Sequence, residues 1–337
     1  MYEFLNSTNA DDFENYVLTH ENGSFTQSLR WANVKTNWGS EGVLSRDDHG
    51  NIRGACLVLT KKIPLIRSAL LYAPRGPIYS DENALSELMA GIDVLAEKKR
   101  AFAFICDPPI ADCGAFRNVG FSRTVTDEKH TIQCRSNYIL NLEDRTLSDI
   151  RAGFKPDYRN RISKAQRRGV KCEELRGTGA LNALDDFYAL MIETGRRDDF
   201  PIRSKEYFAR LLTALGKHAR LYMCSSDLGG KIALSGAVAV EYGGKFSYVY
   251  GASSSDWREL YPCYLMQWTM INAAVESGCR VYDFGGVPYY YDVSRPEYGM
   301  YRFKKGFGGE LAVYAGELVK VYRPLLTRAA ALSAMLL

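Results

Sequence analysis

The chain has 337 residues, of which 46% are hydrophobic and 24% charged, with a net charge of +4. These values are ordinary for a globular protein and exclude a disordered, collagen-like or heptad-repeat chain. No stretch reaches the roughly 18 uninterrupted apolar residues of a membrane-spanning helix, and the acidic N-terminal segment differs from a secretory signal. We therefore expect a cytoplasmic protein of about two domains.

The first half predicts three strands, a helix and a further strand. The strands begin after Gly42 and continue over 52–63 and 68–80, the helix follows over 82–100, and the last strand covers 101–107. Turn residues separate the strands, and the apolar residues of the helix recur at helical spacing.

The second half repeats this order after a basic segment and two helical stretches. Its three strands, helix and final strand are predicted over 219–228, 231–244, 245–254, 261–278 and 280–286. An aspartate closes the last strand of each half, Asp107 in the first and Asp283 in the second. After Gly309 the chain reads as a strand and a helix that return to the first domain.

Two copies of one unit predict an α/β (α+β) fold of two tandem domains. The order matches that of the Gcn5-related N-acetyltransferase fold. We expect a first domain over 1–145, completed by the C-terminal tail 312–337, and a second domain over 146–311.

The acyl-CoA motif of that fold, R/Q-x-x-G-x-G/A at a helix N-terminus, is not matched. The nearest segments, QRRGVK and RNVGFS, place Lys171 and Ser122 at the last position, and neither joins a central strand to a helix. Without this pyrophosphate anchor we expect an acyl donor other than CoA, and no cofactor. The eight cysteines form no CxxC pair and the four histidines lie far apart, so we expect no metal site.

The segment from Arg151 to Lys171 carries eight cations and one acid, Asp157. Its spacing predicts a helix that ends at Gly169, with Tyr158 on its apolar side. A solvated face is the ordinary explanation of a charge run. Eight cations so close together would repel one another, so we give equal weight to a second explanation, in which the segment binds an anionic partner, either phosphate or nucleic acid.

Six segments together resemble the FemABX aminoacyltransferases, in the order of that family. They are FTQSLRWANVK, LLYAPRGPI, KPDYRNRISKAQRRGV, RRDDFPIRSKEYF, LYPCYLMQWTMINAAVESGCRVYDFGGV and YRFKKGFGGE. The resemblance implies two Gcn5-like domains and an enzyme that builds peptidoglycan bridges from aminoacyl-tRNA. This chain is similar to the shorter members, which lack the coiled-coil insertion.

The resemblance also implies roles for individual residues. Lys35 and Arg203 match residues that bind the acceptor diphosphate. The residues that match the lining of the acceptor groove are Asp107, Tyr207, Tyr248 and Tyr250. Phe303 and Lys304 match the pair at the aminoacyl ester, where a fixed ammonium stabilises the oxyanion and Asp107 orients or deprotonates the attacking amine. Lys305 adjoins Lys304, so the assignment could differ by one residue.

Residue types alone support simpler explanations for several of these positions. Lys35 follows Trp31 on a predicted helix and would be solvated there. Asp107 would form a turn before two prolines. Tyr248 and Tyr250 alternate along a strand, so we expect them on one face, where packing is the ordinary role.

The implied donor is aminoacyl-tRNA, with Arg159, Lys164 and Arg168 as phosphate contacts. The implied acceptor is a UDP-linked muropeptide or its lipid-linked form, which leaves peripheral contact with the inner face of the membrane open. We expect a monomer. Two alternatives remain, an acyl-CoA-dependent N-acyltransferase and a non-catalytic RNA-binding module.

Overall fold

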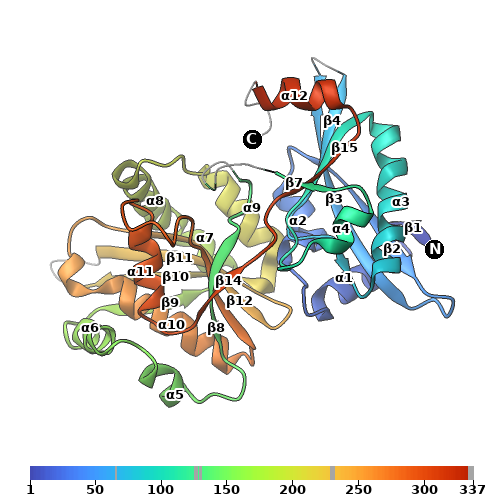
Figure 1. The fold of residues 1–337 in the computed structure, drawn as a ribbon. Coiled ribbons are helices and arrows are strands. Elements are labelled where there is room, and N and C mark those ends of the chain that lie inside the picture. Colours follow the sequence, from blue (N-terminus) through green and yellow to red (C-terminus); the bar gives the residue numbers. More distant parts are fainter. Residues whose placement is uncertain (65–66, 125–127, 129–130, 228–231, 333–337) are drawn as a thin grey trace. The chain divides into compact units, whose positions relative to one another are not determined.

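The computed structural model describes the chain except for residues 65–66, 125–127, 129–130, 228–231 and 333–337. It divides into two compact units, each built on its own sheet (Figure 1). The first unit comprises Met1–Ser136 and the described part of Val313–Leu337, and the second comprises Asn137–Ala312. The last residues of the predicted terminal helix and the ends of two predicted strands, at 228 and 231, lie outside the described residues.

The first unit contains, among its described residues, an eight-stranded sheet of order β1-β2-β3-β4-β6-β15-β7, with β5 paired to β3. The strands are β1 Tyr2–Phe4, β2 Gly39–Arg46, β3 Ile52–Ile63, β4 Ser68–Ala73, β5 Ile78–Tyr79, β6 Ala101–Cys106, β7 Ser122–Arg123 and β15 Leu318–Val321. The helices are α1 Ala10–Thr19, α2 Leu29–Val34, α3 Glu82–Lys99, α4 Gly114–Asn118 and α12 Pro324–Leu332.

Local sequence explains the central βαβ connection of this unit. The Asp81 side chain accepts from the Ala84 N–H and so caps α3, which ends where Arg100 adopts a left-handed conformation. The helix buries one apolar face on the sheet and returns the chain to β6, which lies parallel to β4. The tail adds β15 antiparallel to β6, so it forms part of the first unit's sheet.

The second unit contains a seven-stranded sheet of order β14-β8-β13-β12-β11-β10-β9 within the described part of the chain. The strands are β8 Ser136–Asn141, β9 Lys171–Leu175, β10 Ala219–Ser226, β11 Ile232–Tyr242, β12 Lys245–Ser253, β13 Val281–Gly286 and β14 Glu310–Val313. The helices are α5 Leu147–Ala152, α6 Pro156–Arg167, α7 Gly177–Asn182, α8 Leu184–Asp198, α9 Lys205–Leu215, α10 Pro262–Glu276 and α11 Tyr298–Lys305.

The first unit ends at Ser136, earlier than the expected residue 145. The reason is that β8, which begins at this point, pairs with β13 in the second sheet, with Asn141 opposite Val281. Local sequence predicts a strand here, but it does not specify the partner strand. The predicted strand over 68–80 is also divided, because the backbone turns at Arg75, whose φ is 53°.

The basic segment folds as predicted. Its helix, α6, buries Tyr158, Ile162 and Ala165, and Gly169 follows with a φ of 78°. The buried residues of α6 join a hydrophobic core with α10 and one face of the second sheet. The helices α8 and α9 contact β10, β11 and β12 through other residues, which include Phe187 and Phe208.

Candidate active site

The candidate site in the second unit lies where two parallel strands separate. The strands β12 and β13 pair over three residues, from Lys245 opposite Val281 to Ser247 opposite Asp283, and each strand then continues. Parallel strands that diverge in this way expose backbone groups that a ladder would otherwise use. Side chains from other elements of the same unit therefore supply hydrogen-bond partners at this point.

Lys304 is one of those partners. Its side chain is only 4% exposed, and its Nζ donates to the Gly286 carbonyl oxygen at 2.8 Å. Gly285 lies beside it with a φ of 79°, and a Cβ on that glycine would stand 3.8 Å from Nζ and 3.1 Å from the Tyr248 carbonyl oxygen. An ammonium fixed in a nearly water-free position interacts strongly with a developing negative charge.

Phe303, the neighbour of Lys304 on α11, packs within a cluster of aromatic rings. Its ring centroid lies 6.2 Å from that of Tyr158, 5.3 Å from that of Tyr264 and 5.3 Å from that of Phe307. The cluster joins α11 to α6 and α10. It thereby links the helix that carries Lys304 to the helix that carries the basic segment.

Tyr248 and Tyr250 do not share a face of the sheet, so that expectation is wrong. Tyr248 lies opposite Ala239 and Tyr250 opposite Val238, because Val249 forms a bulge between them. Tyr248 packs against the core on the α10 side, whereas Tyr250 contacts Phe208 on α9. The alternation rule fails wherever a strand has one extra residue.

Tyr250 meets two of the other predicted acceptor residues. Its hydroxyl lies 3.1 Å from that of Tyr207, and the Arg203 guanidinium lies 5.7 Å from the centre of the Tyr207 ring. Burial raises the pKa of Tyr207. Arg203 itself is exposed, so its charge is available to an anion beside the two tyrosine side chains.

The absence of a side chain at Gly251 leaves space for the Tyr248 ring. A Cβ at this position would overlap the Tyr248 hydroxyl and ring. We expect Gly251→Ala to lower the free energy of unfolding by about 1–3 kcal/mol, because the ring must leave its rotamer or the strand must shift. The matched control is Gly179→Ala on α7, where a Cβ would meet only Leu175 at 3.9 Å. Urea denaturation of both variants tests this, and equal midpoints would contradict it.

In the first unit, Asp107 is 1% exposed and both of its oxygens are engaged. It accepts from the Tyr72 hydroxyl at 2.7 Å and from the Arg75 N–H at 2.6 Å. Burial raises the pKa of its carboxyl, although the Arg75 charge opposes that change. Asp107 therefore holds the turn after β4, and its direct part in proton transfer stays a prediction.

Lys35 ends α2 in the same unit and is half-buried. Its Nζ lies 5.3 Å from the centre of the Trp31 ring, an arrangement in which the aromatic face stabilises the ammonium. Lys35 is therefore not simply solvated, because its ammonium also contacts the Trp31 ring.

The described residues contain no group of three metal-ligating side chains and no helix long and apolar enough to cross a membrane.

The chain matches the family model described as the FemAB family over residues 8–119, 115–229 and 224–334. The chain belongs to the FemAB family. A relative named lipid II:glycine glycyltransferase, from Staphylococcus haemolyticus (strain JCSC1435), is 28% identical over 97% of both chains. One of the same name from Staphylococcus aureus is 27% identical over 97% of both chains.

Solved structures agree with this membership. The crystal structure of FemX matches 97% of this chain and 99% of its own, with a TM-score of 0.87 and 25% identity. A tandem GNAT protein from the clavulanic acid biosynthesis pathway covers 95% and 98% with a TM-score of 0.57 and 10% identity, and so supports the fold alone. The predicted fold class and the aminoacyltransferase class of this enzyme are both confirmed.

The alignment to the S. haemolyticus relative spans 416 positions, more than the 337 residues of this chain. That relative therefore carries insertions which this chain lacks. This agrees with the expectation of a short FemAB member.

The structure adds aromatic partners to the basic segment of this FemAB chain. Arg161 donates to the Tyr264 hydroxyl and lies 5.6 Å from the Tyr261 ring centre, and Arg168 lies 5.9 Å from the same ring. Sequence reasoning missed these two tyrosines. Their spacing of three residues, at the start of a predicted helix, was the available signal.

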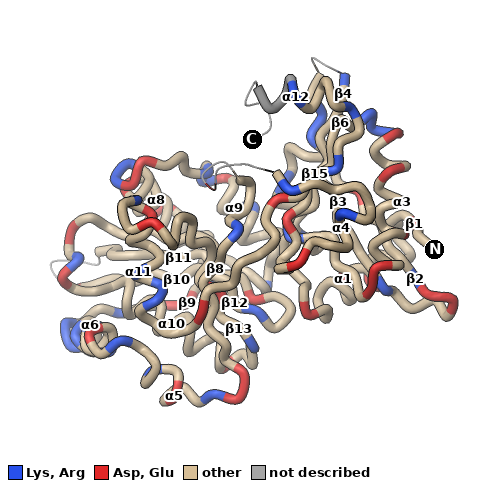
Figure 2. Tube along the Cα trace, viewed as in Figure 1, with Lys and Arg blue, Asp and Glu red and all other residues tan. Residues whose placement is uncertain are grey.

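The three predicted phosphate contacts have different surroundings. Arg159 donates to the Ala152 carbonyl oxygen at 2.6 Å, Arg168 donates to the Glu259 carbonyl oxygen, and Lys164 is half-buried on the same helix. Figure 2 shows how densely Lys and Arg follow one another along α6. The guanidinium groups of Arg159 and Arg168 are thus held by backbone carbonyl oxygens of the second unit.

Proposed function

We propose that this enzyme transfers an amino acid from aminoacyl-tRNA to the side-chain amine of a peptidoglycan precursor stem peptide, and so builds an interpeptide bridge. The acceptor class follows from the relatives, which are named lipid II:glycine glycyltransferases. The observation that carries the proposal is the Lys304 ammonium, nearly buried and held at the point where β12 and β13 separate. This position suits the carbonyl oxygen of an acyl donor.

The reaction requires no covalent enzyme intermediate. The stem-peptide amine attacks the ester carbonyl carbon, and the new C–N bond leaves a tetrahedral oxyanion that Lys304 stabilises by about 3 kcal/mol. The C–O bond to the terminal ribose then breaks. The ribose oxygen leaves as a hydroxyl and the amine loses a proton, so that a peptide bond and deacylated tRNA result.

Lys35 and Arg203 supply the two kinds of cation that a diphosphate needs. A lysine ammonium acts as a point charge, and an arginine guanidinium forms a bidentate fork. Asp107 and the tyrosines Tyr207, Tyr248 and Tyr250 are proposed to line the acceptor groove. Phe303 is proposed to contact the aminoacyl ester beside Lys304.

The start of α10 favours a donor other than acyl-CoA. Tyr261 precedes α10 in a left-handed conformation, and Pro262 is the first residue of the helix. Proline has no N–H, so this helix N-terminus offers one donor fewer to a pyrophosphate. Binding of acyl-CoA by calorimetry would revive the N-acyltransferase alternative, whereas membership of an enzyme family removes the non-catalytic one.

The proposed donor and acceptor can be tested together. The enzyme is incubated with a mixed pool of charged tRNAs and with either the lipid-linked or the UDP-linked precursor, and the mass of the precursor is measured. We expect an increase equal to one or more amino-acid residues that disappears when the tRNA is deacylated. An increase that persists with deacylated tRNA would contradict the proposed donor.

The basic helix is proposed to meet the tRNA backbone. We expect the triple reversal of Arg159, Lys164 and Arg168 to Glu to raise the apparent constant for charged tRNA and to flatten its salt dependence, because fewer counterions are released. Reaction with a minimal aminoacyl-nucleotide donor should persist, since this donor has no stem.

The control carries the same change of charge elsewhere, with Lys62, Lys98 and Arg117 of the first unit reversed to Glu. Steady-state kinetics at several salt concentrations compare the two triple variants. An unchanged salt slope in the α6 variant would favour a solvated face. Loss of the minimal donor as well, with the fold verified by circular dichroism, would place the helix at the acceptor instead.

A further inference from the structure

The end of β13 is bent by a bulge. The strand pairs regularly with β8 up to Asp283 opposite Ile139, and the next pair is Gly286 opposite Asn137. Two residues of β13 therefore stand against one residue of β8. Gly285 within this bulge has a φ of 79°, a conformation that residues with a Cβ rarely adopt.

The Asp283 carboxylate fastens this bulge. Its Oδ1 accepts from the Gly285 N–H at 2.7 Å. The Asn137 amide, on β8, donates to Oδ1 at 3.1 Å and to Oδ2 at 2.9 Å. Asn137 is 7% exposed and Asp283 is half-buried, so these bonds are partly shielded from water and fix both strands. Asp283 and Asn137 together form the Asp283–Asn137 clamp.

The bulge determines where the Gly286 carbonyl points, and that carbonyl accepts from Lys304 Nζ at 2.8 Å. We propose that Asp283 and Asn137 are positioning residues of the transferase site, which hold the Gly285–Gly286 bulge and, through its carbonyl, the ammonium of Lys304. The proposal rests on the proposed function, in which Lys304 serves the ester carbonyl.

Geometry explains why the bulge needs this clamp. A regular continuation of β13 would turn the Gly286 carbonyl toward a neighbouring strand, as in any ladder. The bulge instead directs it to α11, and a Cβ on Gly285 would stand only 3.1 Å from the Tyr248 carbonyl oxygen, which leaves little space for a side chain here. A catalytic group displaced by about 1 Å can lose a hundredfold in rate, so a small relaxation here is enough to matter.

The test exchanges the two partners. Asn137→Asp alone places two carboxylates face to face, and we expect kcat to fall by about 10- to 100-fold with KM for the acceptor within about threefold. Adding Asp283→Asn again pairs one side-chain amide with one carboxylate, with the two positions exchanged. The asparagine introduced at position 283 can accept from the Gly285 N–H and donate to the carboxylate introduced at position 137. We expect the double variant to recover most of the lost kcat.

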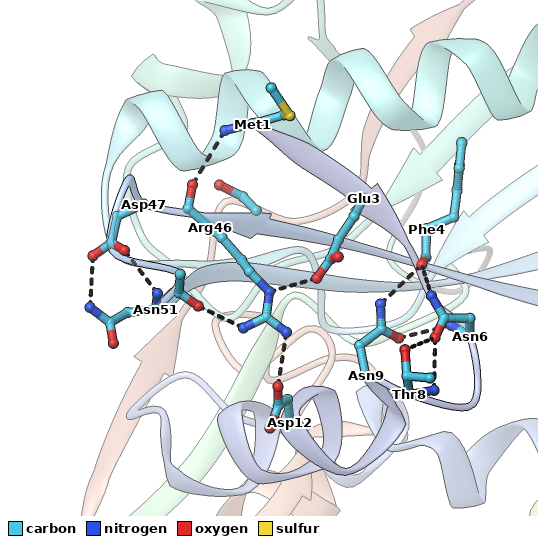
Figure 3. A network of polar contacts seen from close by, with 12 residues as sticks. Met1, Glu3, Phe4, Asn6, Thr8, Asn9, Asp12, Arg46, Asp47 and Asn51 are labelled. Carbon is cyan, nitrogen blue, oxygen red and sulfur yellow. Dashed lines mark hydrogen bonds and ion pairs between the residues drawn. The ribbon is translucent and has the colours of Figure 1, made fainter.

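A matched control exists in the first unit. Asp47 accepts from the Asn51 N–H at 2.8 Å and from its side-chain amide at 3.0 Å (Figure 3). Asn51→Asp creates the same meeting of carboxylates at an exposed turn, and kcat should stay at the wild-type value. This control shows what an Asp–Asn pair contributes when no site depends on it.

Three results would overturn the proposal. These are an Asn137→Asp enzyme with wild-type kcat, a double variant that folds but is as slow as the single one, and a loss confined to KM. If the single variant does not fold, the double variant still decides, because it keeps the hydrogen bonds. Lys304→Met is measured in parallel: activity in that variant would refute the role of Lys304 in the proposed function, whereas its inactivity beside unaffected Asn137→Asp would refute the positioning role alone.

Discussion

Lys304→Met is expected to lower kcat by at least about a hundredfold and to leave acceptor affinity within a few-fold. The reason is that a contact to the oxyanion strengthens only as the tetrahedral intermediate forms, so its loss raises the barrier without weakening the ground-state complex. Methionine keeps the length and the apolar stem of the lysine. It therefore fills the nearly buried position beside Gly286 without an unpaired charge.

Lys305→Met is the matched control, because Lys305 is adjacent but exposed, with its Nζ 5.3 Å from the centre of the Tyr301 ring. Single-turnover kinetics on both variants, together with acceptor binding by calorimetry, provide the comparison. A large loss in Lys305→Met with an active Lys304→Met would show that the neighbouring lysine is the catalytic one.

Lys35→Ala and Arg203→Ala are expected to weaken acceptor binding, each by about 1.5–3 kcal/mol, because each removes a charge-assisted hydrogen bond to the diphosphate. The effect should appear in KM and in the dissociation constant more than in kcat. Binding of the diphosphate-bearing muropeptide is compared with binding of the free peptide. Equal losses for both ligands would contradict the phosphate assignment.

Lys205→Ala separates this effect from a general loss of positive charge. Lys205 lies two residues from Arg203 and forms an exposed ion pair with Asp185 at 2.5 Å. Removing an exposed ion pair usually costs less than about 1 kcal/mol, so acceptor binding should hardly change. Arg203→Lys adds a second comparison, because it keeps the charge and loses the bidentate fork.

The fold could be predicted from the sequence wherever local signals decide the structure. The apolar spacing and the following Gly169 define α6, and Asp81 and Arg100 bound α3 at the predicted positions. Strand pairing could not be predicted in the same way. The strand β8 reads as the end of the first domain, yet it pairs with β13, since an isolated strand carries no signal that specifies its partner.

The site was predictable in part, and the difference again has a physical reason. The family resemblance names Lys304 and Phe303, but not the Asp283–Asn137 clamp behind them, because a bulge depends on pairing between strands far apart in sequence. The bulge at Val249 also depends on strand pairing, so the sequence could not predict that Tyr248 and Tyr250 lie on opposite faces of the sheet. Asp107 was expected to act on the substrate, and only the structure reveals its bonds to Tyr72 and Arg75.

A crystal structure with a stable amide analogue of the aminoacyl-nucleotide donor would measure the distance between Lys304 Nζ and the carbonyl oxygen that it is proposed to stabilise. We expect the analogue's carbonyl oxygen within about 3.2 Å of Lys304 Nζ, at the point where β12 and β13 separate. A carbonyl oxygen bound elsewhere, with Nζ still on Gly286 and out of reach of the analogue, would contradict it.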